Sequence, residues 1–210
     1  NKIEVVKNPI ETAHGLPNEC YLNDDYLEFE KEKIFKNNWT MIGVASSVPN
    51  PGDAKPFNLL GIPILIVRNK ENEVKVFHNV CSHRGFKLVD QECKLKNVIR
   101  CPYHSWSYDF NGKLTVTPHI GGLGKHEVEG FDKNNSNLKE IKSNIWMDLI
   151  FININSNAKP FEDFIKPLED RWSKFISKKD QKLIRHSSDN GYFNMTVNSN
   201  WKFAIENYCE

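Results

Sequence analysis

The sequence has no apolar run that approaches the roughly 18–20 residues of a membrane-spanning helix. It begins with the polar stretch NKIEVVKN, which lacks the apolar core of a secretion signal. An excess of charge of one sign is also missing, since 28 basic and 27 acidic residues leave a formal net charge of +1. A balanced charge gives no electrostatic reason to expect nucleic acid or a membrane surface as a partner.

Cysteine is scarce, and its number is odd. Disulfide frameworks are typical of short secreted chains with paired cysteines, whereas this chain has 210 residues. Its five cysteines are Cys20, Cys81, Cys93, Cys101 and Cys209. The pattern favours metal-binding cysteines in a reducing compartment, the cytoplasm. The chain has no initiator Met and stops at NYCE within an expected helix, so we expect it to be part of a longer protein.

The distribution of apolar residues predicts an α+β fold. Hydrophobic residues make up 39% of the chain, enough for one large domain or two small ones. One helix is predicted from the caps Asp24 and Asp25 through about Lys36. Further helices are predicted over 160–177 and from Asn200 onward. Strands are predicted over 39–46, 62–69, 74–79, 95–101 and 192–198, within 138–154, and in a hairpin over 107–116 with an Asn111–Gly112 turn. An all-β domain is thus expected over 39–155, between an N-terminal segment 1–38 and the beginning of another domain at 156–210.

Two Cys–His pairs stand within this all-β domain. Their pattern is C-x-H-x17-C-x2-H, formed by Cys81, His83, Cys101 and His104. Two thiolates and two imidazoles suit either Zn²⁺ or a [2Fe–2S] cluster in which two His replace two Cys on one iron. In C-x-H the two side chains are too close in sequence to converge easily on one ion, so the spacing favours two irons.

The segments CSHRG and CPYHSWSYD resemble the Rieske cluster motif, and residues 39–155 have the layout of a Rieske domain. The resemblance implies that Cys81 and Cys101 bind one iron and that His83 and His104 bind the other. Respiratory Rieske proteins carry an additional Cys in each loop, where this chain has Phe86 and Tyr103. The absence of these two cysteines favours the soluble kind of Rieske domain that Rieske oxygenases and their ferredoxins use. Ser105 replaces the usual Gly, and its Cβ is expected to crowd the second loop slightly.

The C-terminal segment NWKFAIENYCE is similar to the NWKxxxEN segment of Rieske oxygenase catalytic (alpha) subunits. The matching residues are Asn200, Trp201, Lys202, Glu206 and Asn207. Glu210 falls on an acidic position for which most of the family has Asp, and Glu occurs in members similar to carnitine oxygenases. The resemblance implies catalytic roles for Asn207 and Glu210, with the ligands of a mononuclear iron beyond Glu210. Cys209 is expected to be buried. Without the upstream motif, the segment is equally consistent with an amphipathic helix that buries its Trp.

The two resemblances together imply the N-terminal portion of a terminal oxygenase, in which 1–38 packs on a helix and antiparallel-sheet catalytic domain. Electrons from NAD(P)H would arrive through a reductase or ferredoxin, and a mononuclear Fe(II) would activate O₂ for mono- or dioxygenation of a small organic substrate. In the family the cluster of one subunit serves the iron of its neighbour in a trimer, with Glu210 here as the bridge from His83 or His104. The Glu at position 210 favours quaternary ammonium substrates over aromatic ones. A Rieske-type electron carrier and a zinc-stabilised binding module remain as alternatives.

Overall fold

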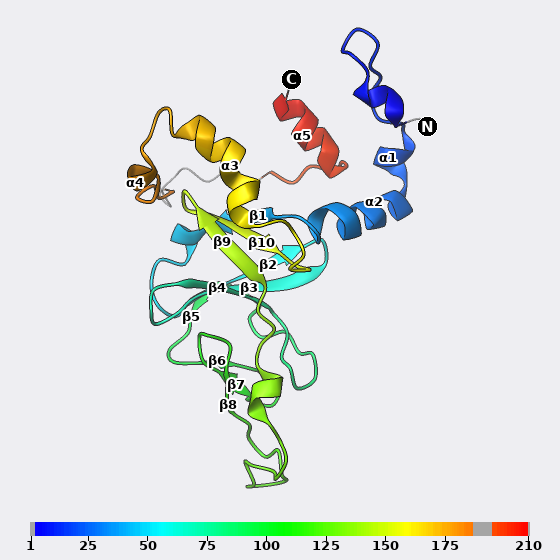
Figure 1. The fold of residues 1–210 in the computed structure, drawn as a ribbon. Helices are drawn as coiled ribbons and strands as arrows, with labels where there is room; N and C mark the ends of the chain where they lie inside the picture. The colour runs from blue at the N-terminus through cyan, green and yellow to red at the C-terminus, as the bar shows by residue number, and fades with distance from the viewer. Residues whose placement is uncertain (1–2, 187–194, 210) are drawn as a thin grey trace.

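The computed structural model describes residues 3–186 and 195–209. The helices lie at one end of the molecule and a small sheet lies at the other, with two larger sheets between them (Figure 1). At one end are the helices α1 (Glu19–Leu22), α2 (Asp24–Glu30), α3 (Phe161–Trp172), α4 (Lys178–Gln181) and α5 (Trp201–Cys209). At the other end is a small sheet of β6 (Ile99–Arg100), β7 (Ser107–Tyr108) and β8 (Leu114–Val116). No helix of the described part of the chain is long and apolar enough to cross a membrane.

Two larger antiparallel sheets connect these ends. The first has the order β1–β10–β9, formed by Thr40–Val44, Leu149–Asn153 and Lys142–Trp146. The second has the order β4–β3–β2–β5, formed by Val74–His78, Ile62–Arg68, Asp53–Leu59 and Cys93–Lys94. Short 3-10 turns occupy η1 (Glu4–Lys7), η3 (Ala45–Ser47) and η4 (Lys133–Ser136), and η2 (Lys31–Phe35) is a π-helical turn. The expected α+β class is confirmed.

Strand β3 explains why the run ILIV is apolar without alternation. Successive side chains of a strand point to opposite faces. Leu65 and Val67 pack in the core shared with the Cys–His loops, whereas Ile64 and Ile66 pack in a second core against β1 and β10. All four side chains are buried, because β3 lies between these two cores.

Several predicted elements differ in detail. The helix near the N-terminus is capped by Asn23, whose side chain accepts from Tyr26 N–H, and not by Asp24 or Asp25. The single strand predicted over 95–101 is wrong, because only Ile99–Arg100 pairs there, while Cys93–Lys94 joins β2. Strand β2 was not predicted. It contains Pro56, which disfavours strand assignment from sequence alone.

The hairpin turn at Asn111–Gly112 is confirmed. Gly112 has φ +80°, and a Cβ there would lie 2.5 Å from a ring carbon of Phe77. Both the backbone conformation and the space therefore require glycine at this position.

The C-terminal helices were predicted better than the strand between them. Helix α3 ends at Trp172 rather than near residue 177, and it packs Phe161 and Ile165 against Trp39 and Phe151. The strand predicted over 192–198 is not tested at 192–194, which lie outside the described residues, and residues 195–198 belong to no strand. Helix α5 confirms the helix expected from Asn200 onward.

Candidate metal centre

The first Cys–His loop is a closed turn. The Cys81 N–H donates to the Phe86 carbonyl at 2.8 Å, and the Gly85 N–H donates back to the Cys81 carbonyl at 2.9 Å. Gly85 has φ +69°, in the left-handed region that glycine adopts without strain. His83 lies at the exposed tip of this turn.

The second loop repeats the same hydrogen-bond pattern. The Cys101 N–H donates to the Trp106 carbonyl at 2.8 Å, and the Ser105 N–H donates to the Cys101 carbonyl at 3.0 Å. Ser105 is the counterpart of Gly85 and shares its left-handed conformation, with φ +58°. The effect of this serine is therefore first of all conformational strain, because a residue with a Cβ is disfavoured in the left-handed region.

The four predicted ligands divide into an inner and an outer pair. Cys81 and Cys101 are each only 2% exposed, whereas His83 and His104 are exposed. The imidazole rings have centroids 5.0 Å apart. Burial raises the pKa of the Cys81 thiol and outweighs the hydrogen bond with Tyr108, which lowers that pKa, while the neighbouring Cys101 thiol adds to the increase. The structure therefore brings the two thiols together beneath the two imidazoles.

A buried tyrosine supports the first thiol. The Tyr108 hydroxyl lies 3.2 Å from Cys81 Sγ and accepts from the Ser82 N–H at 3.2 Å. Ser82 Oγ lies 2.8 Å from the same hydroxyl and donates to the Ser136 carbonyl at 2.5 Å. Burial, followed by the bond to Cys81, raises the pKa of Tyr108 far above its ordinary value, so the hydroxyl keeps its proton. Because Ser82 donates its own proton to Ser136, the single Tyr108 proton has two acceptors, Ser82 Oγ and Cys81 Sγ. A thiolate at Cys81 is the stronger acceptor of the two, because it is charged.

Aromatic rings hold the two imidazoles. The Trp106 indole stacks on His83, with centroids 4.5 Å apart and an interplanar angle of 9°. Tyr103 lies against His104 at 3.7 Å and also contacts Phe86 of the first loop at 5.5 Å. The positions that carry cysteines in respiratory proteins are thus joined here by an aromatic contact.

Asn79 was missed by the sequence analysis. It is fully buried, and its Nδ2 donates to the Val89 carbonyl at 2.7 Å, while its Oδ1 accepts from the N–H groups of Leu88 and Val89 at 3.2 and 3.0 Å. These bonds close the base of the first loop. A single Asn before a Cys has no spacing signal that would reveal this role.

The donor set fits a two-iron cluster better than a single ion. A structural zinc ion gathers four side chains around one point at about 2.0–2.3 Å. Within the described residues, no three His, Cys, Asp or Glu side chains form such a group. A [2Fe–2S] cluster of the Rieske kind instead needs a thiolate pair and an imidazole pair on separate irons. The separation of the four residues into a buried and an exposed pair matches that requirement.

The C-terminal motif lies far from these loops (Figure 1). Asn200, Trp201, Lys202 and Glu206 contact the N-terminal segment, whereas Asn207 is exposed. Glu210 lies outside the described residues. The expectation that Cys209 is buried is wrong, because its side chain is exposed at the end of α5.

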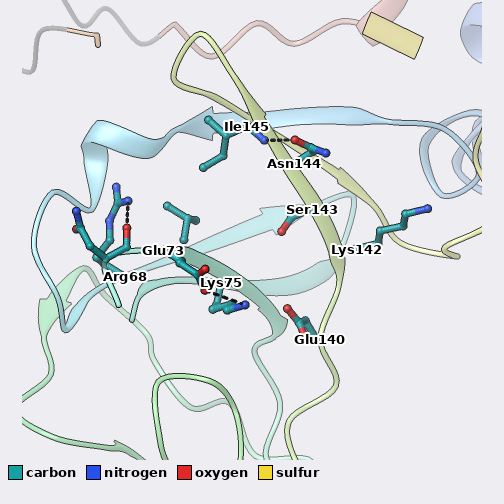
Figure 2. A pocket seen from close by; sticks show the side chains of 10 residues that line it. Arg68, Glu73, Lys75, Glu140, Lys142, Ser143, Asn144 and Ile145 are labelled. Atoms are coloured by element: carbon teal, nitrogen blue, oxygen red, sulfur yellow. Dashed lines mark hydrogen bonds and ion pairs between the residues drawn. The ribbon is translucent and has the colours of Figure 1, made fainter. Parts of the chain in front are cut away.

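A polar hollow of about 680 Å³ opens between β4 and β9 (Figure 2). Arg68, Glu73, Lys75 and Glu140 are among the residues that line it. Glu73 pairs with Lys75 at 3.3 Å, and the Arg68 guanidinium donates to backbone carbonyls. None of the Cys–His loop residues lines this hollow.

Comparisons with known proteins agree with this geometry. The model of the Rieske [2Fe–2S] domain matches residues 38–128, and such a domain implies a [2Fe–2S] cluster. The carnitine monooxygenase oxygenase subunit of Acinetobacter pittii is 33% identical over 204 residues, which are 97% of this chain and 52% of that protein. The corresponding subunit of Escherichia coli K12 is 30% identical over the same share of this chain and 51% of its own length.

A solved structure extends the match to three dimensions. The quaternary ammonium Rieske monooxygenase CntA, in complex with γ-butyrobetaine, superposes with a TM-score of 0.78 at 31% identity. The match covers 92% of this chain and 53% of that one. The chain spans about half the length of the curated relatives it matches. Residues 38–128 are thus a Rieske [2Fe–2S] domain, and over nearly its whole length the chain is homologous to about half the length of the oxygenase subunits of Rieske monooxygenases.

Proposed function

We propose that Cys81 and Cys101 bind the inner iron of a [2Fe–2S] cluster and that His83 and His104 bind the outer iron. The buried thiols and exposed imidazoles support this assignment. Such a cluster supplies one-electron transfer with little rearrangement of its ligands. The Tyr108 hydroxyl stabilises the negative charge at Cys81, and the stacked Trp106 ring fixes the orientation of His83.

We propose that the chain is part of a terminal oxygenase that uses O₂ to hydroxylate a small organic substrate. The main observation in support is that the same chain contains both the Cys–His loops and the NWKFAIEN segment at α5. An electron carrier would have no use for this helix or for the contacts that hold it. The domain division 1–38, 39–155 and 156–210 follows this proposal, with the last part opening the catalytic domain.

The substrate class proposed is a quaternary ammonium compound. The named relatives act on carnitine, and the CntA complex holds γ-butyrobetaine. Glu210, in place of the more common Asp, is consistent with that group.

Glu210 is proposed as the bridge between an imidazole of the cluster and an imidazole of the mononuclear iron site. A carboxylate can accept hydrogen bonds from two imidazole N–H groups at once. Within one chain, α5 and the Cys–His loops lie at opposite ends of the molecule (Figure 1). This separation supports electron delivery between neighbouring subunits, and we propose a homotrimer. An NAD(P)H-dependent reductase or ferredoxin is the proposed electron donor.

We propose the cytoplasm as the location, because an odd number of cysteines, two of them in the Cys–His pairs, favours metal-binding cysteines in a reducing compartment.

The metal centre is tested on the 210-residue chain. Purified protein should be red-brown, with two irons and two labile sulfides for each chain. Stoichiometric zinc without sulfide would overturn the cluster assignment.

The oxygenase proposal is tested on the full-length protein with a reductase and NADH. We expect O₂ consumption with carnitine or γ-butyrobetaine and little with aromatic compounds. Glu210→Gln should retain both metal sites and reduction of the cluster, yet oxidise its cluster far more slowly in stopped flow with substrate and O₂. Glu210→Asp should be milder, because charge and acceptor capacity survive. If Glu210→Gln oxidises its cluster as fast as the wild type does, Glu210 is not part of the electron-transfer route.

A further inference from the structure

A charged pair lies buried where α5 meets the N-terminal segment. Lys202 Nζ donates to both carboxylate oxygens of Glu30, at 2.7 and 2.8 Å, and the two side chains are 8% and 5% exposed. Trp201 Nε1 donates to the same carboxylate at 2.9 Å. The ammonium also lies 5.4, 5.7 and 5.2 Å from the ring centroids of Tyr21, Tyr26 and Trp201. At these distances an aromatic face attracts a cation.

A second set of contacts on α5 involves Tyr21. Its hydroxyl donates to Glu206 Oε1 at 2.6 Å, and its ring stacks on Phe203 with centroids 4.6 Å apart. Its backbone carbonyl accepts from Asn200 Nδ2 at 3.1 Å. The hydrogen bond to Glu206, followed by burial, raises the pKa of Tyr21 to about 12, so the hydroxyl remains a donor at neutral pH.

These contacts use one face of α5, and Asn207 lies at the edge of that face. Lys202 and Glu206 are four residues apart and therefore lie on the same face of the helix. Asn207 is rotated by about 100° from Glu206. Its side chain is exposed and makes no hydrogen bond to another described residue. The other matched residues of the motif thus bind the N-terminal segment, whereas Asn207 lies beside Phe203, four residues before it, with its side chain exposed.

The N-terminal segment is itself tied to the Rieske domain. Helix α2 continues through η2, and the carbonyls of Lys36 and Asn38 accept from Asn153 Nδ2 at 3.0 and 3.1 Å. Asn153 belongs to β10 and is fully buried. Glu30 therefore connects α5 to the sheet of the Rieske domain through a short, hydrogen-bonded path.

Stability alone is a poor explanation for a buried ion pair. Removing two charges from water offsets much of their attraction, and apolar side chains of similar volume often stabilise such sites as well or better. An ion pair is, however, directional, because an alternative register would leave a charge buried and unpaired. Its distinctive contribution here is orientation.

We propose that Glu30 and Lys202 are positioning residues that set the roll and register of α5 relative to the Rieske domain of the same subunit. They thereby orient Asn207 and the segment that follows it toward the reaction site. A slip of one residue would rotate Asn207 by about 100° and move it by about 1.5 Å along the axis. The inference rests on the proposed oxygenase function for its kinetic consequence, but not for its structural one.

The double variant Glu30→Gln with Lys202→Met tests the structural consequence in the 210-residue chain. It removes both charges at nearly constant volume and leaves no lone charge buried. We expect the urea midpoint to stay near that of the wild type, while amide hydrogen exchange in α5 becomes about tenfold faster. The matched control, Lys166→Met with Asp170→Asn, removes an exposed pair on α3 and should change neither value.

The same variants in the full-length oxygenase test the kinetic consequence. We expect an unchanged cluster potential and a cluster oxidation rate that is about 10- to 100-fold lower with substrate and O₂. A role confined to stability would not slow oxidation in a fully folded variant. Wild-type exchange in α5 together with a wild-type oxidation rate would overturn the inference.

A conservative variant covers the case in which the double variant does not fold. Glu30→Asp keeps both charges but shortens the side chain by one methylene, so it changes only the distance from the carboxylate to Lys202. We expect slower cluster oxidation at an unchanged potential, and a wild-type rate would overturn the inference. If the wild-type protein itself oxidises no substrate, the proposed function fails, and the exchange experiment still decides the role of the pair.

Discussion

Replacing Tyr108 by Phe removes one oxygen atom from the cluster environment. The Tyr108 hydroxyl is 3.2 Å from Cys81 Sγ, and the side chain is fully buried in the core beneath the loops. Phe has nearly the same shape, so we expect the loops to keep their course. The change should lower the reduction potential, because reduction adds a negative charge that a nearby donor stabilises.

The size of the effect follows from the geometry of this hydrogen bond. A hydrogen bond to a charged group contributes about 1.5–3 kcal/mol. Only the part that differs between the oxidised and reduced states affects the potential, and we take this as about 1–2 kcal/mol. Since 59 mV corresponds to a tenfold change in a one-electron equilibrium, or about 1.4 kcal/mol, the potential should fall by about 40–85 mV.

The assay is a redox titration of the purified chain, followed by its visible spectrum. Tyr103→Phe is the matched control, because Tyr103 stands in the second loop and its hydroxyl makes no hydrogen bond to a described residue. The control should leave the potential unchanged. If Tyr108→Phe shifts the potential by less than about 10 mV, or roughly 0.2 kcal/mol, the hydroxyl does not donate to Cys81 in the cluster-bound protein.

Three further predictions concern His104, the two left-handed loop positions and Asp53. His104→Cys should retain a cluster at a potential lower by roughly 200 mV or more, because an anionic thiolate replaces a neutral imidazole; an unchanged potential in a redox titration would contradict the ligand assignment. Ser105→Gly should raise the free energy of unfolding of the apo chain by about 0.5–1 kcal/mol, and Gly85→Ala should lower it by about 1 kcal/mol, since both positions are left-handed; chemical denaturation shifts of the same sign would refute this. Burial alone raises the pKa of Asp53, but bonds from Lys94 and a backbone N–H outweigh it and hold that pKa below its ordinary value. The ionised Asp53 carboxylate therefore stabilises the fold fully above the unfolded pKa of about 3.9, and this stabilisation is lost as pH falls through the lower folded pKa. In Asp53→Asn the urea midpoint should consequently fall less steeply between about pH 5 and pH 2 than in the wild type. An equal decrease of the midpoint in the two proteins would contradict the assignment.

The parts of the fold that were predictable have local causes. The apolar run of β3, the Asn-Gly turn and the helical spacing of α3 each depend on neighbours within a few residues. Strand β2 was missed because Pro56 disfavours a strand locally, while its pairing with β3 compensates through contacts that only the fold supplies. The strand predicted at 95–101 was wrong for the same reason, since pairing partners decide which apolar residues join a sheet.

The candidate site divides in the same way. Residue type and spacing alone led to the proposal of Cys81, His83, Cys101 and His104 as ligands, because cluster chemistry requires those donors and the two loops are short. Nothing local connects Tyr108 to Cys81, which are 27 residues apart.

By itself, the sequence determined which donors are proposed and which family the chain resembles, because thiolates, imidazoles and loop spacing are properties of short segments. Only the tertiary structure decided what surrounds and orients them. It buried the thiols, exposed the imidazoles, and joined Glu30 to Lys202 across 172 residues of chain. Such pairs form because packing brings distant segments together and excludes water from between them, and no short pattern of residues encodes which two segments will meet.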